Sequence, residues 1–205
     1  MIIIDEYDQR DPQWHLSRIP SIGGTGINIA ASKGDGRKKY IIQKAGEILS
    51  KTPKDSFVSY AMKRGITFEP RARAYYEMLN SVKVRTVAMV KHDDSKHFSP
   101  DFLVGDDGFG EIKVREPEVF VQMVHDKPNL ITSERRQIQW GFRILGRKWC
   151  DHIDYCPEID DAGTIDPAII RRIYPDPKEI ETLDQACNKF LMELYQYISE
   201  VKHGK

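Results

Sequence analysis

Two acidic residues and a lysine, Asp101, Glu111 and Lys113, lie close together in the sequence. Residues 102–104 are apolar, a Gly-Asp-Asp-Gly turn follows, and residues 109–114 alternate between apolar and polar types, which predicts two short antiparallel strands. Side chains two apart on a strand share a face, so Glu111 and Lys113 point the same way, and pairing brings Asp101 towards them. The sequence therefore predicts two carboxylates and an ammonium group at one place.

This set of groups suits the hydrolysis of a phosphodiester. Hard divalent cations such as Mg²⁺ take oxygen ligands, usually one or two carboxylates with water completing the shell, and Asp101 and Glu111 supply such oxygens. The ammonium of Lys113 can stabilise charge that develops on a phosphate, or orient the attacking water. A surface hairpin with a simple Glu-Lys pair explains the same residues, and the hairpin alone does not decide between the two interpretations.

The two halves of the hairpin, Pro100-Asp101 and Glu111-Ile112-Lys113, resemble the PD-(D/E)xK nuclease signature. Further matches in the same order resemble the lambda-exonuclease (YqaJ-like) viral recombinase family over about residues 14–156. These matches are Trp14 with Arg18 and Thr25, the run Gly-Ile-Thr-Phe-Glu-Pro-Arg-Ala-Arg at residues 65–73, Ser99, and Gln-Ile-Gln-Trp at residues 137–140.

The resemblance implies a metal site with defined ligands. Asp101 and Glu111 would hold the ion, with the backbone carbonyl of Ile112 as a third ligand, and Glu69 would support a second ion or the water. The expected cofactor is Mg²⁺, with Mn²⁺ able to take its place, and two ions in each site.

The resemblance also implies groups that position the nucleophile and the DNA. Lys113 and Gln137 would position the nucleophile. Arg18 and Thr25 would form a phosphate pocket, which Ser99 and Gln137 would complete around a terminal 5′ phosphate. Taken singly, each has an ordinary explanation: Arg18 as a surface charge, Thr25 as a helix cap, Ser99 as a turn former and Gln137 as a solvated helix residue.

For the whole protein, the resemblance implies a Mg²⁺-dependent exonuclease that digests double-stranded DNA from its ends in the 5′-to-3′ direction. It would leave 3′ single-stranded tails for phage-type homologous recombination. It would work processively as a ring-shaped homotrimer, beside a single-strand annealing recombinase. Two alternatives remain open: an endonuclease of the same superfamily, and a DNA-binding or assembly protein with a degenerate nuclease core. The presence of Asp101, Glu111 and Lys113 together speaks against a degenerate core.

Composition describes an ordinary globular protein of 205 residues, of which 40% are hydrophobic and 30% charged. The formal net charge is zero, so the total charge does not indicate a nucleic-acid binder, but its distribution is uneven. Residues 33–54 hold seven Lys or Arg against two acids, whereas residues 151–185 hold ten acids against three basic residues. Nucleic acid would therefore meet the N-terminal half. The cluster that includes Lys38 and Lys39 is explained equally by contact with duplex backbone and by solvation.

Neither the cysteines nor the N-terminus indicates an exported or membrane protein. Cys150, Cys156 and Cys187 have no pattern of disulfide pairs or zinc ligands. The apolar N-terminal run ends at once at Asp5 and Glu6, and no run of eighteen apolar residues exists. We expect a soluble cytoplasmic protein of a bacterial host cell, with no membrane partner.

The elements that must position these residues predict an α/β fold. The apolar periodicity predicts helices at about 37–50, 55–63, 67–80, 116–125, 133–145 and 177–201, and strands at about 82–90, 102–104, 109–114, 148–155 and 169–174, the last at an edge. Gly65 would end the second helix, Pro70 would lie in the first turn of the third, and His92 and His97 would lie in a loop.

Together these elements form one domain over residues 1–205. Its fold would be a restriction-endonuclease-like core, with a mixed central sheet flanked by helices, over about residues 14–156. A C-terminal strand and helix would follow in residues 157–205.

Overall fold

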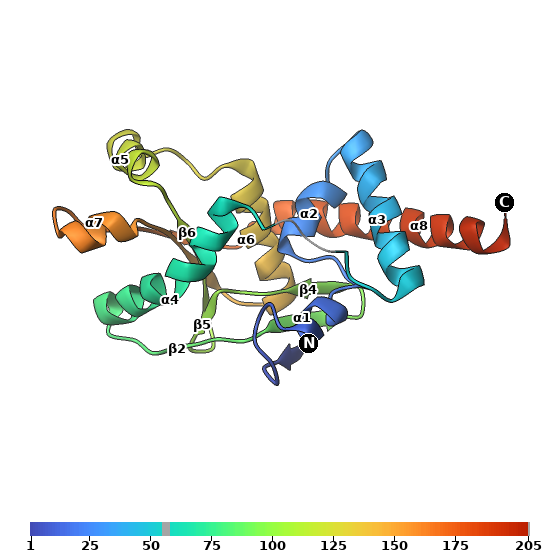
Figure 1. Ribbon diagram of the computed structural model, residues 1–205, viewed down its shortest axis with the longest axis horizontal. Coiled ribbons are helices and arrows are strands. Elements are labelled where there is room, and N and C mark those ends of the chain that lie inside the picture. The colour runs from blue at the N-terminus through green and yellow to red at the C-terminus, as the bar shows by residue number, and fades with distance from the viewer. Residues whose placement is uncertain (55–57, 205) are drawn as a thin grey trace.

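The computed structural model describes residues 1–54 and 58–204 as one α/β arrangement of helices around two sheets (Figure 1). In chain order the elements are β1 (Ile2–Ile4), α1 (Pro12–Ser17), α2 (Gly24–Ala30), α3 (Asp35–Ser50), α4 (Tyr60–Asn80), β2 (Val84–Arg85), β3 (Met89–Asp93), β4 (Lys96–Phe98), β5 (Phe102–Val104), β6 (Gly108–Val114), α5 (Pro117–Asp126), α6 (Thr132–Leu145), β7 (Trp149–Tyr155), α7 (Pro157–Ala162), β8 (Ala168–Ile173) and α8 (Pro177–His203).

The larger sheet has five strands in the order β2-β5-β6-β7-β8. The predicted hairpin is confirmed, since β5 pairs antiparallel with β6. β6 and β7 are parallel, because the chain between them crosses over through α5 and α6, and β8 pairs antiparallel with β7 at the edge. The mixed central sheet flanked by helices is therefore confirmed.

Helices cover both faces of this sheet. Since successive strand residues face opposite sides, Phe109 and Ile112 of β6 enter different cores. Phe109 packs with buried residues of α2, α3, α6 and α8, whereas Ile112 packs with Ala72 and Tyr76 of α4. α4 therefore covers one face of the sheet, and α2, α3, α6 and α8 cover the other.

One predicted strand, residues 82–90, is two strands in the structure. β2 pairs with β5 in the larger sheet, whereas β3 lies between β1 and β4 in a separate three-stranded sheet. The apolar pattern does not reveal the change of sheet, because Val87 and Ala88 between the two strands are themselves buried. The loop predicted for His92 and His97 was also wrong, since these residues lie in β3 and β4.

The two helices predicted at 55–63 and 67–80 are one helix, α4, which continues through Gly65 and Pro70. The predicted start at residue 55 lies outside the described residues. A proline inside a helix costs about 3 kcal/mol. The contacts on either side of it outweigh that cost: Arg64 binds Glu158 of α7, and Tyr76 is buried against Phe102.

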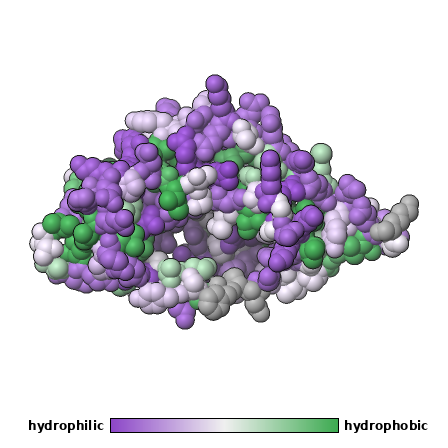
Figure 2. All heavy atoms as spheres, turned by 90° about the horizontal axis from the view of Figure 1, so that it is seen from above, coloured by the Kyte–Doolittle hydropathy of each residue, from purple (hydrophilic) through white to green (hydrophobic). Residues whose placement is uncertain are grey.

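The surface of the molecule is hollowed on one side. Viewed from above, hydrophilic residues surround a hollow between the end that carries α4, α5 and α7 and the end that carries α3 and α8 (Figures 1 and 2). Among the helices of residues 1–54 and 58–204, none has the length and apolar character needed to cross a lipid bilayer.

Candidate active site

The candidate site forms where β5 begins and β6 continues beyond it. Phe102, the first residue of β5, pairs with Gly110. Ile112 lies beyond that pair, and its N–H donates to the Asp101 carboxylate at 2.5 Å instead of to a strand. The N–H and C=O of a strand residue face the same neighbour, so the Ile112 carbonyl also faces the gap beside Asp101.

Glu111 lies on β6 with its carboxylate almost fully buried, at 2% exposure. Lys113 Nζ donates to Glu111 Oε1 at 2.8 Å, and the Gln137 side-chain amide of α6 donates to the same oxygen. Lys113 Nζ also lies 3.4 Å from Gln137 Oε1. The other oxygen, Glu111 Oε2, is buried and has no hydrogen-bond partner among the described residues, which is unfavourable unless another group occupies that position.

Glu69 approaches the same place from α4. Its carboxylate binds Arg10 at 3.1 Å and Arg73 at 3.4 Å, and Arg73 also donates to the backbone carbonyl of Asp101 at 3.0 Å. Glu69 and Asp101 line one cavity of about 280 Å³ together with both arginines. Asp101 is therefore close enough to the other two acids for the negative charges of Glu69 and Glu111 to act on it.

The electrostatics of the site favour additional positive charge. Burial raises the pKa of Asp101 well above its ordinary value, and the negative charges of Glu111 and Glu69 raise it further. Burial opposes the charge of Lys113, but Glu111 and Asp101 outweigh that effect and raise its pKa. The lysine is thus held protonated, and a cation beside Asp101 would favour the ionised form of its carboxyl group.

The residues present fit a hard cation. Within residues 1–54 and 58–204, no three His, Cys, Asp or Glu side chains cluster closely enough to form a metal site by themselves. Mg²⁺ requires fewer protein ligands, because it keeps several waters and uses one or two carboxylates. Asp101, the free Glu111 Oε2 and the Ile112 carbonyl offer such a set.

The residues predicted for a phosphate pocket are partly brought together. Arg18 and Thr25 line one cavity of about 460 Å³, and the Arg18 guanidinium lies 3.9 Å over the ring of Trp14. Trp14 Nε1 donates to Ser99 Oγ at 3.3 Å, which connects Ser99 to this region. Gln137 lies next to Gly24 at the start of α2, since a Cβ there would meet its Cγ at 3.0 Å.

Two predicted DNA contacts lie elsewhere. Lys38 and Lys39 are exposed on the first turns of α3, at the right in Figure 1, whereas β5 and β6 lie to the left. A contact between these lysines and DNA would therefore be remote from the carboxylates.

No sequence pattern indicated a role for Arg10, Arg73 or His97, although each contacts a predicted site residue. Arg10 and Glu69 are far apart in the chain, so no local pattern pairs them. Arg73 lies within the matched run at 65–73, one helical turn after Glu69, and the i,i+4 spacing could have indicated the pair. No spacing in the sequence indicates His97, because its partners Arg18 and Ser21 lie in a distant segment of the chain.

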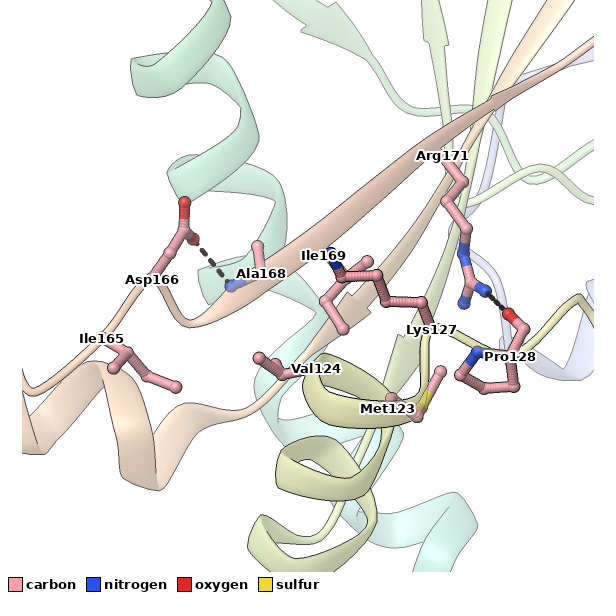
Figure 3. A pocket seen from close by; sticks show the side chains of 9 residues that line it. All are labelled: Met123, Val124, Lys127, Pro128, Ile165, Asp166, Ala168, Ile169 and Arg171. Carbon is pink, nitrogen blue, oxygen red and sulfur yellow. Dashed lines mark hydrogen bonds between the residues drawn. The ribbon is translucent and has the colours of Figure 1, made fainter.

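A further cavity, of about 470 Å³, lies between α5 and the edge strand β8 (Figure 3). It is largely apolar, with Met123, Val124 and Ile169 among its lining side chains, and Arg171 donates to the Pro128 carbonyl at its rim at 2.7 Å. None of the predicted site residues lines it, so it is separate from the candidate site.

Comparison with known proteins agrees with this geometry. The sequence profile of the YqaJ-like viral recombinase domain matches residues 13–144, more than half of the chain. The chain belongs to this family. The crystal structure of an alkaline exonuclease, LHK-Exo from Laribacter hongkongensis, matches with a TM-score of 0.85 and 26% identity, over 95% of this chain and 97% of that chain. The complex of LHK-Exo with dAMP matches equally well.

A phage related exonuclease from Haemophilus somnus 129PT shares the fold, with a TM-score of 0.67 over 88% of this chain and 96% of that chain, at 10% identity. Among curated proteins no significant match is found. The predicted YqaJ-like family and the nuclease-type α/β fold are thus confirmed. Together these findings support a nuclease of the recombinase family.

Proposed function

We propose that this YqaJ-like protein is a metal-dependent deoxyribonuclease that digests double-stranded DNA from its ends in the 5′-to-3′ direction. It would leave 3′ single-stranded tails for phage-type homologous recombination. One observation carries the proposal: Glu111 keeps a buried carboxylate oxygen free beside Asp101, while Lys113 and Gln137 bind its other oxygen. Family membership and the likeness to an alkaline exonuclease support the same reaction.

In the proposed mechanism each side chain has one task. Asp101, Glu111 and the Ile112 carbonyl would hold the metal, and Glu69 would support a second ion or the water. The metal, Mg²⁺ with Mn²⁺ as a substitute and two ions in each site, would supply Lewis acidity for the attack of water on the phosphodiester. Lys113 remains protonated, because Glu111 and Asp101 raise its pKa, and it stabilises negative charge on the phosphate.

Gln137 acts as an orienting group. Its amide can both donate and accept, so it can hold a phosphate oxygen or a water without competing for the metal. Arg18, Thr25 and Ser99, together with Gln137, would anchor the terminal 5′ phosphate so that the next phosphodiester lies over Asp101. Such positioning lowers the barrier by fixing the reacting groups in advance.

The proposal extends to the surroundings of the enzyme. It would be a single domain that assembles as a homotrimer on double-stranded DNA ends in the cytoplasm of a bacterial host cell. A single-strand annealing recombinase would receive the 3′ tails. Lys38 and Lys39 would contact the duplex backbone away from the site.

The test compares linear duplex with covalently closed circular DNA in the presence of Mg²⁺ and after chelation by EDTA. We expect digestion of the linear substrate only, with loss of a 5′-end label before a 3′-end label, and no digestion in EDTA. Cleavage of the circle would instead support an endonuclease. Binding of duplex ends without cleavage of either substrate would support a DNA-binding protein with an inactive core.

A further inference from the structure

His97, on β4, is buried at 2% exposure and contacts two polar side chains from the segment after α1. The Nε–H of Arg18 donates to His97 Nε2 at 3.3 Å, and Ser21 Oγ lies 2.6 Å from His97 Nδ1. An arginine is always protonated and only donates, so Nε2 must carry no proton. The imidazole is therefore neutral, and its Nδ1–H donates to Ser21 Oγ.

The backbone around the ring fixes this arrangement. His97 N–H donates to the Ile22 carbonyl at 3.1 Å, and Ile22 N–H donates to the Ser95 carbonyl at 2.8 Å, so the segment that carries Ser21 is bound along β4. Gly23 leaves room for the ring, because a Cβ at that position would lie 2.4 Å from His97 Nε2. The ring thus has one well-defined position beside Arg18.

Arg18 is held on two sides and free on a third. The Trp14 ring covers one face of the guanidinium at 3.9 Å, and His97 accepts from Nε. Within the part of the chain that the structure describes, neither terminal nitrogen of Arg18 has a hydrogen-bond partner. Arg18 lines the cavity that Thr25 also lines, and paired donors on a guanidinium match the oxygens of a phosphate.

We propose that His97 is a positioning residue, which holds Arg18 so that its two terminal nitrogens receive the terminal 5′ phosphate of a DNA end. This inference rests on the proposed function, since it concerns the same DNA end. A side chain ordered before binding loses less conformational freedom when the ligand arrives. The structure thereby connects end selection to a histidine that does not touch the DNA.

The surroundings of His97 keep it in the accepting form. Burial lowers its pKa well below the ordinary value, and the positive charges of Arg18, Lys44 of α3 and Lys91 of β3 lower it further. The negative charge of Glu47 acts on Arg18 and on Lys44, and Glu47 is bound to Lys44 at 3.0 Å. The acceptor for Arg18 is therefore available at neutral pH.

The test measures selectivity between ends by two readouts. The first is the Kd for duplex ends with 5′-phosphoryl or 5′-hydroxyl groups, measured by fluorescence anisotropy in EDTA. The second is kcat/KM on the same two substrates with Mg²⁺. The variants are His97→Leu, which removes the acceptor, His97→Gln, which can keep an acceptor near the position of Nε2, and Arg18→Ala as the reference for complete loss.

We expect the unaltered protein to prefer 5′-phosphoryl ends by roughly tenfold or more, the usual effect of one charge-assisted hydrogen bond. His97→Leu should lose most of this preference, as Arg18→Ala does, and His97→Gln should retain most of it. Constants for 5′-hydroxyl ends should stay unchanged in His97→Leu and His97→Gln, which separates positioning from general damage to the fold. Should His97→Leu fail to fold, Ser21→Ala should lower the preference in the same direction, because it removes the acceptor for Nδ1–H.

Two results would overturn the inference. One is a preference that His97→Leu or Ser21→Ala leaves intact while Arg18→Ala abolishes it. The other is equal binding of both ends by the unaltered protein, which would remove the phosphate anchor altogether while leaving a Mg²⁺-dependent digestion of DNA unaffected. Conversely, preference in binding without any cleavage would support the role of His97 and contradict the proposed nuclease.

Discussion

Asp101 and Glu111 place two acids in a part of the protein that solvates charge poorly. Burial, together with the charges of Glu111 and Glu69, keeps the pKa of Asp101 raised, and Lys113 compensates only in part. A fold that served stability alone would gain from an uncharged residue here. The arrangement is therefore best explained by a ligand that carries positive charge.

The first prediction concerns these two residues as a unit. Asp101→Ala should reduce Mg²⁺-dependent DNA hydrolysis to background, and the Asp101→Ala/Glu111→Ala double variant should be no worse, because the effects of groups that act together are not additive. Initial rates on linear duplex measure the effect. Lys113→Ala should still bind DNA ends but fail to cut them.

A matched control for the carboxylates is Asp106→Ala, which removes one acid from the exposed turn between β5 and β6. Its hydrolysis rate should equal that of the unaltered protein. Mg²⁺ should also raise the Tm of the unaltered protein and of Asp106→Ala, but not of Asp101→Ala, because a ligand stabilises only the state that binds it. Substantial hydrolysis by Asp101→Ala would refute the site assignment.

At the scale of elements, a buried ionic cluster on β7 joins parts of the fold that are distant in sequence. Asp154 is fully buried and accepts from Arg115, which follows β6, at 2.6 Å, and from Arg171 of β8. Arg115 also binds Glu134 of α6 at 2.7 Å. A single carboxylate thus holds two neighbouring segments against β7, and Arg115 extends the cluster to α6.

The second prediction is a pH dependence of stability that comes from Asp154. Burial opposes its ionisation, but His152 and Arg115 outweigh burial and lower its pKa to about 2, below the usual 3.8. The contribution, about 2 kcal/mol, is complete above the unfolded pKa and is lost as the pH falls from about 5 towards 2. Urea unfolding across this range should show a smaller acid loss of stability in Asp154→Asn.

The control for this prediction is Asp94→Asn, in the exposed turn between β3 and β4, which should follow the unaltered protein at every pH. Asp154→Asn should also be less stable than both at pH 7, because it leaves the half-buried Arg115 and Arg171 without a full partner. Equal acid slopes in all three proteins would show that Asp154 is not the group responsible.

The third prediction concerns α3 as a DNA-binding element. If Lys38 and Lys39 each neutralise a phosphate, replacing both with alanine should reduce the slope of log K against log salt concentration by about 1.8, at about 0.9 for each contact. Affinity for duplex at low salt should fall, while the hydrolysis rate at saturation stays unchanged. Lys83→Ala/Lys178→Ala, which removes two exposed lysines from other elements, is the matched control. An unchanged slope would mean that Lys38 and Lys39 are merely solvated.

How far the sequence predicts an element depends on how much of the element is determined locally. The hairpin β5–β6 and the helices α5, α6 and α8 were predicted because turn residues and apolar periodicity define them. α4 was divided wrongly at Gly65, because a glycine at that point is a local signal for a helix end, whereas the contacts of Arg64 with α7 that keep it whole are distant in sequence. The short elements β1, α1, α2, β4 and α7 were not predicted, since they carry too few residues for a periodic pattern.

The same distinction applies to the candidate site. The spacing of Asp101, Glu111 and Lys113 indicated a cluster, because all three belong to one hairpin. Arg10 and His97 could not be found in this way, because their partners are distant in sequence. Arg10 binds Glu69, and His97 accepts from Arg18. Resemblance to a family supplied Glu69 and Gln137, which local pattern alone did not.

At the scale of the whole molecule, the structure changes the interpretation of charge. The acid-rich segment 151–185 is not a free acidic surface, because arginines from other elements bind many of its carboxylates. Arg172 binds Asp151, Arg71 binds Asp160 and Asp161, and Arg135 binds Asp176 and Glu179. Arg37 and Lys44 of α3 are paired in the same way, with Glu193 and Glu47, so the uneven charge along the sequence overstates the unevenness of charge on the surface.

The last prediction is a closed homotrimer. Identical chains that contact one another head to tail form a ring when the rotation closes, and a ring can surround a duplex with the basic residues of α3 towards its phosphates. Light scattering coupled to size-exclusion chromatography should give a mass three times the 23.7 kDa of one chain, at micromolar concentration and moderate salt. The mass should not change in Asp101→Ala, whose substitution lies in the active site.

A ring that surrounds its substrate also predicts how digestion proceeds. Such an enzyme leaves the DNA only when the ring opens or the end is reached, so excess unlabelled duplex, added after the reaction starts, should not stop digestion of the labelled molecules already engaged. The Lys38→Ala/Lys39→Ala variant distinguishes encirclement of the DNA by the ring from electrostatic attraction of the DNA to these lysines. It should weaken initial binding and yet leave the resistance to competitor DNA intact. A monomeric mass, with immediate arrest by competitor, would rule out the ring while leaving hydrolysis at Asp101 and Glu111 in place.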